Sequence, residues 1–356
     1  MVSFKNTVFT RAGGTTPPAF QPLDVDGVIF LADMIDPQNR NTAFANRRDL
    51  EKTTHETRDE VMAGLRGAGY AAVHLEHPSD LTQDLAWARR HVVLSTYGGE
   101  VHRSRTTWAP AICEAHDIPY VGLDAYGQGI CHSKMAAKRL AREAGLKTPR
   151  AREYHAVRDL RHLSDWAFPV IVKPSSEGSS IGISQDSIAH TEDELEAIAA
   201  GLFAELDTAV MVEEFVAGRE VSFAAIQTHD GAFTSFNEVV VAGAPEYFAT
   251  RVWDAAEKFR HDLPRRVNSI DAELREEDCL AISRFLTALG DYGYIRLDGR
   301  LSGGRLHFLE ATPDAWLGVG GQLCQGFEND GWTYAQVIAA IIETARARLP
   351  SPAATG

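Results

Sequence analysis

Residues 170–184 read VIVKPSSEGSSIGIS, and their types and spacing are suited to holding a phosphate group. The opening run is apolar and β-branched, which is typical of a buried strand that carries Lys173 to its end. Pro174 ends the strand, and the small residues at 175–182 leave backbone N–H groups free to face an anion. A hairpin turn beside a solvated lysine is the plainer interpretation of the same residues.

Lysine usage favours the phosphate site. Most of the 35 basic residues are arginines, so the chain uses lysine sparingly. A lysine at a strand end is then informative, because its compact charge on a flexible stem suits phosphate binding.

Two carboxylates, Asp298 and Glu310, lie on the predicted strands 294–301 and 305–311, which form a hairpin. Their side chains can therefore converge on one side of this hairpin. Arg296 precedes Asp298 by two residues, so both side chains project from the same face of the strand. Taken alone, two such acids are more often solvated or salt-bridged than bound to a metal.

Composition sets the class of protein. With 356 residues, 44% hydrophobic and 24% charged, the chain can bury a large core in two or three lobes. A net charge of -14 argues against a nucleic-acid groove, and no apolar run is long enough to span a membrane. The four cysteines lie far apart, which indicates neither a disulfide framework nor a zinc site. We expect a cytoplasmic protein.

Strands and helices alternate in the first third of the chain. Strands are predicted at 27–33, 71–76 and 91–99, with helices at 57–67 and 107–116, which indicates a doubly wound parallel sheet. The first thirty or so residues read as irregular, and 36–53 reads as a long loop of the kind that is often functional.

The remaining elements build two further lobes. Ser133 is a plausible N-cap for a helix that ends at Gly145. We expect an N-terminal lobe, a central subdomain, a C-terminal subdomain and a short tail, at 1–130, 131–222, 223–349 and 350–356. Further helices are predicted at 190–202, 275–290 and 334–348, with strands within 209–226 and at 237–242.

These motifs, taken in chain order, resemble the ATP-grasp fold and most closely the D-alanine–D-alanine ligase family. The likeness rests on a helix-opening Lys134, IVKPSSEGSSIG, EEFV at 213–216, and an Arg-x-Asp followed by EATP at 310–313. WDAAEKF at 253–259 also resembles the family's mobile segment over the phosphates. The likeness covers 117–348 and implies an α/β protein in which an N-terminal parallel-sheet lobe and two α+β lobes enclose ATP.

The resemblance implies a role for each matching residue. Lys134 and Lys173 would neutralise phosphates, with Lys258 swinging in when its loop closes. The glycine/serine loop would cover the phosphates. Glu213 would bind adenine together with the backbone hinge at 215–216, and Glu220 would bind the ribose. The implied nucleotide-binding residues are Lys134, Lys173, Glu177, Ser179, Ser180, Glu213, Phe215, Val216, Glu220 and Lys258.

The same resemblance implies a metal site and a reaction. Asp298, Glu310 and Thr312 would hold Mg²⁺, as two ions in the family's manner, and Arg296 would stabilise an oxyanion with Lys258 and Ser180 as the other catalytic residues. A substrate carboxylate would become an acyl phosphate, and an amine would then displace phosphate to give an amide. Relatives of this kind are commonly homodimers.

Several positions depart from the family pattern. Thr312 replaces an asparagine ligand, so either Thr312 binds weakly, or Asp314 helps, or one ion is held less tightly. Bulky Trp316 falls near the acceptor pocket. The family's ammonium-binding glutamate is not recognisable; Glu56 could replace it or be a plain helix-start acid. The turn with Glu100 also gains His102, Arg103 and Arg105, which could clamp a substrate carboxylate or form a solvated basic loop.

These departures favour an amino acid or dipeptide substrate other than D-alanine. Two other functions compete with the ligase. A regulator could keep the ATP site without turnover, and Thr312 is its best support. A metabolite-binding protein without ATP is disfavoured by the lysines and the loop.

Overall fold

A computed structural model gives the arrangement of most of the chain. Lys258 and Glu100, with their predicted roles, lie outside the residues that it describes, as does the predicted tail at 350–356. The described residues are 9–11, 17–35, 48–99, 102–160, 163–206, 208–228, 231–244, 246–254, 257 and 264–349.

The first lobe contains a three-stranded parallel sheet in the order β3-β2-β4. Central β2 is buried at every position, which explains its unbroken apolar run. The parallel sheet predicted for this lobe is therefore present. Its strands are β2 (Gly27–Leu31), β3 (Ala72–Leu75) and β4 (His91–Ser95), and its helices are α1 (His55–Gly67), α2 (Leu85–Ala88), α3 (Trp108–Ala115) and α4 (Ala125–His132).

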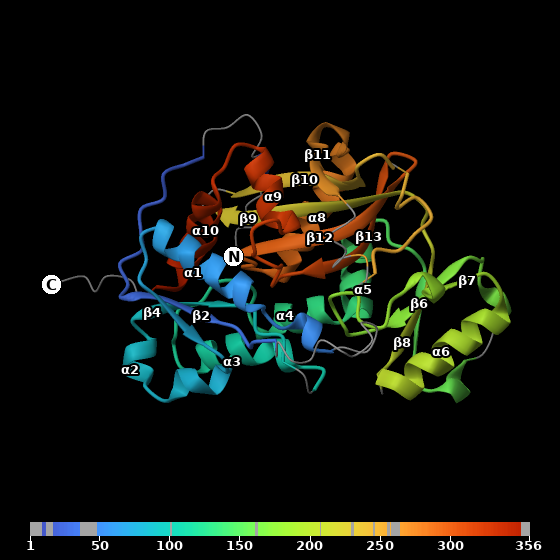
Figure 1. Ribbon diagram of the computed structural model, residues 1–356, viewed down its shortest axis with the longest axis horizontal. Helices are drawn as coiled ribbons and strands as arrows, with labels where there is room; N and C mark the ends of the chain where they lie inside the picture. Colours follow the sequence, from blue (N-terminus) through green and yellow to red (C-terminus); the bar gives the residue numbers. More distant parts are fainter. Residues whose placement is uncertain are drawn as a thin grey trace.

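A four-stranded sheet in the order β5-β8-β6-β7 forms the second lobe, at the lower right of Figure 1. Helix α6 (Glu192–Leu206) covers it, and Val170 and Val172 pack with Leu195 in a separate core. The strands are β5 (Ala151–Tyr154), β6 (Val170–Pro174), β7 (Ile188–Ala189) and β8 (Val210–Glu214).

A six-stranded sheet dominates the rest of the molecule. Its strands are β1 (Phe9–Arg11), β9 (Arg219–Thr228), β10 (Gly231–Val241), β11 (Arg265–Ser269), β12 (Tyr294–Ser302) and β13 (Arg305–Thr312). The predicted end of the central subdomain, residue 222, lies within β9. Strand β1 pairs in parallel with β10, whereas we expected an irregular start; three residues are too few to show an alternating pattern.

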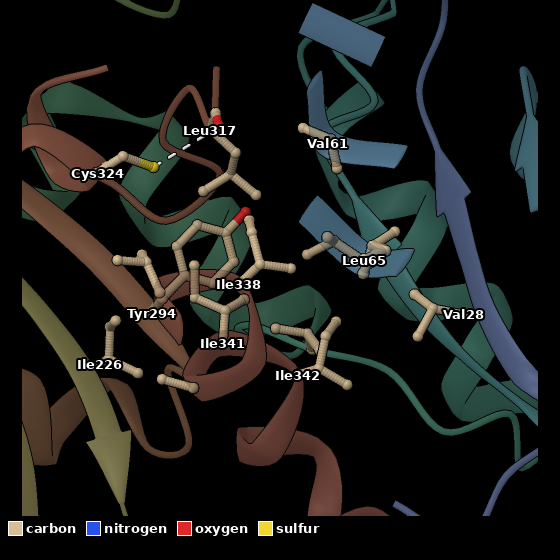
Figure 2. Packing of buried hydrophobic residues seen from close by; sticks show 14 of the residues in the cluster. Val28, Val61, Leu65, Ile226, Tyr294, Leu317, Cys324, Ile338, Ile341 and Ile342 are labelled. Carbon is tan, nitrogen blue, oxygen red and sulfur yellow. Dashed lines mark hydrogen bonds between the residues drawn. The ribbon is translucent and has the colours of Figure 1, made fainter. Parts of the chain in front are cut away.

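Helices cover both faces of the six-stranded sheet. On one face, α5 (Lys134–Ala144) and α8 (Glu276–Leu289) share a core with its apolar residues. On the other face lie α9 (Gln322–Asn329) and α10 (Tyr334–Glu343). Figure 2 shows that this second core also includes Val61 and Leu65 of α1. The first lobe and the six-stranded sheet are thus joined by one apolar core.

Helix α5 begins and ends as its sequence predicts. The Ser133 hydroxyl accepts a hydrogen bond from the Ala136 N–H, and Gly145 ends the helix with a left-handed φ of 94°. Both Lys134 and Lys138 lie on its buried face. In Figure 1 the helix runs between the four-stranded and six-stranded sheets, so these two lysines can reach residues of both.

Two findings bear on the class of protein. All four cysteines are free thiols, and three of them are buried. Within the described ranges, no helix has the length and apolar character needed to cross a bilayer.

Candidate active site

The buried lysines of α5 bring the two sheets' functional residues together. Lys173 at the end of β6 forms an ion pair with Glu213 of β8, with Nζ and Oε2 2.6 Å apart. Lys138 pairs with the other oxygen of Glu213, and its Nζ also donates to the Phe308 carbonyl on β13. One turn earlier, Lys134 Nζ lies 3.2 Å from Glu310 Oε2. Residues predicted to meet around a triphosphate do lie around one helix.

Burial and charge act on this cluster in opposite directions. Lys138 is fully buried, and burial lowers its lysine pKa to about 8 despite the attraction of Glu213. For Glu213, burial alone would raise the pKa, but the two lysines together lower it below the usual glutamate value. We therefore expect Glu213 to be ionised and held between two cations.

The glycine/serine loop contains a tight turn with an uncommon backbone conformation. Ser179 and Ser180 both have left-handed φ angles, 49° and 60°, and the Ile181 N–H donates to the Gly178 carbonyl. Two consecutive residues with positive φ define a type I′ turn, and for residues other than glycine or asparagine this is strained. Lys134 Nζ donates to the Glu177 carbonyl at 2.5 Å, so the helix lysine also fixes the loop.

The hairpin places its two acids opposite each other. Asp298 and Glu310 are register partners on β12 and β13, next to a β-bulge. Arg296 holds Asp298 with two hydrogen bonds of 2.6 and 2.8 Å, so the two side chains share a face as predicted. Thr312 Oγ1 donates to Asp298 at 3.3 Å.

This donor set fits magnesium. Among the described residues, no group of three His, Cys, Asp or Glu side chains could hold a metal without other ligands. Mg²⁺ usually binds through one or two carboxylates together with water and substrate phosphates, and Asp298 with Glu310 supplies two. In this structure the cations Arg296 and Lys134 balance their charges.

The predicted adenine hinge lies where the chain leaves the four-stranded sheet. The Phe215 N–H donates to the Pro169 carbonyl, and both Phe215 and Val216 are half-buried. Beyond the hinge, Glu220 Oε2 pairs with Arg300 Nε at 3.0 Å. The hinge and the predicted ribose acid are therefore adjacent.

The basic turn of the first lobe divides into two parts. His102 and Arg103 are exposed, as expected of a solvated loop. Arg105 is only 4% exposed and its Nη2 pairs with both Glu51 and Glu177. Since Glu51 also accepts from the Gly178 N–H, the first lobe contacts the glycine/serine loop directly.

His132 adds a neutral group to this cluster. Its Nε2 lies 3.3 Å from Arg105 Nη1. Burial, together with the charges of Arg105 and Lys134, lowers the pKa of His132 to about 3. The imidazole is therefore uncharged at neutral pH.

The segment after β13 faces the first lobe. Burial, aided by the charge of Glu51, raises the pKa of Asp314 to about 6. Trp316 is 52% exposed, and its indole N–H donates to the Thr57 hydroxyl of α1 at 3.0 Å. Glu56, the other acid considered for the ammonium, is exposed in the first turn of α1.

The sequence interpretation missed several residues of the site. Glu51 lay in a stretch read only as a functional loop, and its short 3₁₀ helix, Arg48–Glu51, gives no periodic signal. Lys138 follows Lys134 by four residues and so shares its helix face, a signal that could have found it. Arg300 shares a strand face with Arg296 and Asp298, which is the same kind of signal.

Comparison with known proteins identifies the family. The family described as "D-ala D-ala ligase C-terminus" matches residues 147–343, more than half of the chain. The chain belongs to the D-alanine–D-alanine ligase family. The matched region contains β6, the glycine/serine loop, the hinge and the β12–β13 hairpin, so the predicted resemblance is confirmed.

Relatives of this family match over most of their length. A D-alanine–D-alanine ligase of Desulforudis audaxviator is 29% identical over 70% of this chain and 79% of its own length. One from Bordetella petrii is 30% identical over 66% and 71%. One from Aquifex aeolicus is 25% identical over 84% and 98%.

Solved structures confirm the fold. A crystal structure of D-alanine–D-alanine ligase from Bacillus anthracis complexed with ATP has a TM-score of 0.67, at 20% identity, over 90% of this chain and 98% of its own. The VanG D-Ala:D-Ser ligase from Enterococcus faecalis has a TM-score of 0.65, at 17% identity, over 89% and 98%. These structures confirm the predicted ATP-grasp fold. The family and its curated relatives confirm a ligase that forms a C–N bond, and the catalytically silent regulator is not supported.

Proposed function

We propose that this family member is an ATP-dependent, ADP-forming ligase that joins an amino-acid carboxylate to an amine. One observation carries the proposal: Lys134, Lys138 and Lys173 lie around α5 together with Glu213 and Glu310. Cations from helix α5 and strand β6 and an acid of the hairpin are thus placed where a magnesium nucleotide would need them.

ATP would exchange some of these ion pairs for phosphate contacts. Lys134 and Lys173 would bind phosphates, with the N–H groups of Ser179 and Ser180 covering them. When Lys173 leaves Glu213, one carboxylate oxygen becomes available to the adenine amino group, while Lys138 keeps the other. The backbone of Phe215 and Val216 would complete the hinge. Glu177 and Glu220 would complete the nucleotide site, and Lys258 stays a predicted contact to the γ-phosphate.

Magnesium would be held by Asp298 and Glu310, with Thr312 as a weaker third ligand. When bound, Mg²⁺ neutralises charge on the phosphates during transfer. Two ions remain our prediction. Arg296 would leave Asp298 partly free and turn toward the reacting carboxyl group, where it stabilises the oxyanion of the tetrahedral intermediate.

The reaction follows from these positions. A carboxylate oxygen of the first substrate attacks the γ-phosphorus, and the bond to the β-phosphate oxygen breaks to release ADP. The amine of the second substrate then adds to the acyl phosphate, loses a proton and expels phosphate, leaving an amide. Ser180, whose hydroxyl donates to the Trp253 carbonyl at 2.8 Å, helps to close the loop over the acyl phosphate.

Charge around Arg105 indicates which carboxylate substrate fits. Glu51 and Glu177 pair with the one guanidinium, the charge of Asp314 also acts on it, and His132 is neutral. This excess of negative charge disfavours a second substrate carboxylate and favours an ammonium group. We therefore propose an α-amino acid as the carboxylate substrate, with its ammonium near Glu51 and Asp314.

Trp316 would limit the second substrate. Relatives named for D-alanine and for D-Ser show that the family's acceptor varies. We propose an acceptor amine other than D-alanine, because a half-exposed indole fixed on Thr57 reduces the space beside the hairpin. We further propose a cytoplasmic homodimer; four free thiols support the location.

A phosphate-release assay tests the proposal. Wild-type protein with ATP, Mg²⁺ and pools of L- and D-amino acids is expected to release phosphate and to form ADP and an amide, both identified by mass spectrometry. Arg296→Gln should lower kcat roughly 100- to 1,000-fold while ATP still binds. ATP binding without amide formation in any pool would indicate the regulator instead.

A further inference from the structure

Arg300 connects three parts of the nucleotide site that are distant in sequence. It lies on β12, two residues beyond Asp298, and its side chain is almost fully buried at 4% exposure. Its Nε pairs with Glu220 at 3.0 Å, and its Nη1 donates to the Gly218 carbonyl at 3.0 Å. The guanidinium also lies 6.0 Å from the centre of the Phe215 ring. One end of the guanidinium thus holds the hinge and the predicted ribose acid.

The same guanidinium also holds the segment at 246–254, which we call the covering segment. Nη1 donates to the Phe248 carbonyl, and Nη2 donates to the Arg251 carbonyl at 2.7 Å. Contacts to backbone carbonyls fix the path of this segment independently of its side chains. A lysine could not make them all, because it lacks the planar fork of donors.

The covering segment is held from its second side by the glycine/serine loop. Gln185 exchanges two hydrogen bonds with the backbone of Val252, through Nε2 to the carbonyl at 2.8 Å and from the N–H to Oε1 at 3.3 Å. Nε2 also donates to Asp254 at 2.9 Å, and Ser180 Oγ donates to the Trp253 carbonyl. The Gly218 N–H also donates to the Ala249 carbonyl at 3.2 Å, and Phe248 packs with Val239 and Val241. Of the three side chains Arg300, Gln185 and Ser180, only Arg300 also contacts Glu220.

We propose that Arg300 is a positioning residue that couples the ribose to the covering segment. This inference rests on the proposed nucleotide site, in which Glu220 accepts hydrogen bonds from the ribose hydroxyls. Arg300 aligns the Glu220 carboxylate for the ribose and, with the same planar group, holds the segment that leads toward the phosphates. When the ribose of a nucleotide binds Glu220, Arg300 therefore already holds the covering segment in place.

A purely structural role predicts something different. If Arg300 only filled a buried polar position, its replacement would lower stability and would affect all nucleotides equally. If it aligns Glu220, its replacement reduces the enzyme's preference for ATP over 2′-deoxy-ATP. This preference is a ratio of two kcat/KM values, so a general loss of stability or activity does not change it.

The test compares four proteins: wild type, Arg300→Met, Glu220→Gln and Gln185→Ala. We expect wild type to prefer ATP over 2′-deoxy-ATP by roughly 10- to 100-fold, the range for losing a hydrogen bond to a charged group. Glu220→Gln and Arg300→Met should lower the preference to about threefold or less, and Gln185→Ala should keep it. Hydrogen exchange of residues 246–254 should be faster in Arg300→Met and Gln185→Ala than in wild type, and unchanged in Glu220→Gln.

Other results would overturn the coupling. The coupling is wrong if Arg300→Met keeps the wild-type preference for ATP. It is also wrong if hydrogen exchange of the covering segment is unchanged in that variant. Equal use of both nucleotides by wild type would overturn the ribose role of Glu220 and the coupling with it. If Arg300→Met does not fold, Arg300→Lys serves instead; it keeps the charge and loses the fork, so the same changes are expected.

Discussion

The proposed phosphate side and the proposed amino-acid side of the site are built in different ways. On the phosphate side, Lys173, the glycine/serine loop and the hairpin acids each come from a continuous motif that can be recognised on its own, although the Lys134–Glu310 ion pair spans 176 positions. On the amino-acid side, the salt bridge between Glu51 and Arg105 joins residues 54 positions apart. The Glu51 contact with Gly178 spans 127 positions.

This difference explains why the sequence reveals the family more clearly than it reveals the substrate. Every member of this family is expected to bind the same ATP phosphates, so one strand, turn and lysine at fixed spacing can serve all of them. The amino-acid side has to match one substrate, and side chains from several elements can be exchanged to do so. Three predictions test the contrast, from the largest expected effect to the smallest.

Lys138→Met, on the phosphate side, should lower the free energy of unfolding of the protein. The change removes one cation from the fully buried Glu213, and breaking a buried ion pair costs about 3–5 kcal/mol. Since Lys173 remains, we expect about 3 kcal/mol, measured by urea unfolding. Exposed Lys147→Met is the control and should change the free energy of unfolding by about 0.5 kcal/mol or less. A loss below about 1 kcal/mol would show that Glu213 does not depend on two lysines.

His132, on the amino-acid side, should make the stability of the protein fall at acid pH. The folded pKa of about 3 lies below the unfolded value of 6.5, so the unfolded chain binds more protons between these values and stability falls as pH falls below 6.5. From this group alone we expect a loss of about 2 kcal/mol at pH 5. His132→Gln should remove that part of the loss, and exposed His190→Gln should not. Equal acid sensitivity of the two variants in urea unfolding would contradict the prediction.

Trp316→Ala should alter substrate choice and leave ATP use unchanged. Removing the indole should raise kcat/KM for bulkier amines by about tenfold, the size of effect that one or two methylene groups have in a pocket. The KM for ATP should stay the same, since the hydrogen bond of Trp316 is to Thr57 of α1 in the first lobe. Thr57→Val is the control, because it removes only the hydrogen-bond acceptor. An unchanged amine profile would place the acceptor pocket elsewhere.

Local signals explain which parts of the fold were predictable. Ser133 and Gly145 mark the ends of α5 by capping, and the β12–β13 hairpin follows from two strands joined by a short turn. The glycine/serine loop follows strand β6 as its residues indicate. Each of these features depends on residues close together in the chain, so the sequence contains the whole signal.

Long-range contacts explain what was missed. Strand β1 is recognisable only through its pairing with β10, more than two hundred residues later. Burial of Arg105 and exposure of Arg103 could not be separated by composition, because both lie in the same turn. The ion pair between Lys138 and Glu213 depends on how α5 packs between the two sheets.

The sequence by itself determined the family, the ligase chemistry and the main elements, because backbone conformation and phosphate binding follow from short segments. Only the tertiary structure decided that Glu213 lies between two lysines, that acids outnumber the cation around Arg105, and that Arg300 joins the hinge to the covering segment. The physical reason is that charge and hydrogen bonding act through space over a few ångströms, whereas the residues involved are separated by tens to hundreds of positions along the chain.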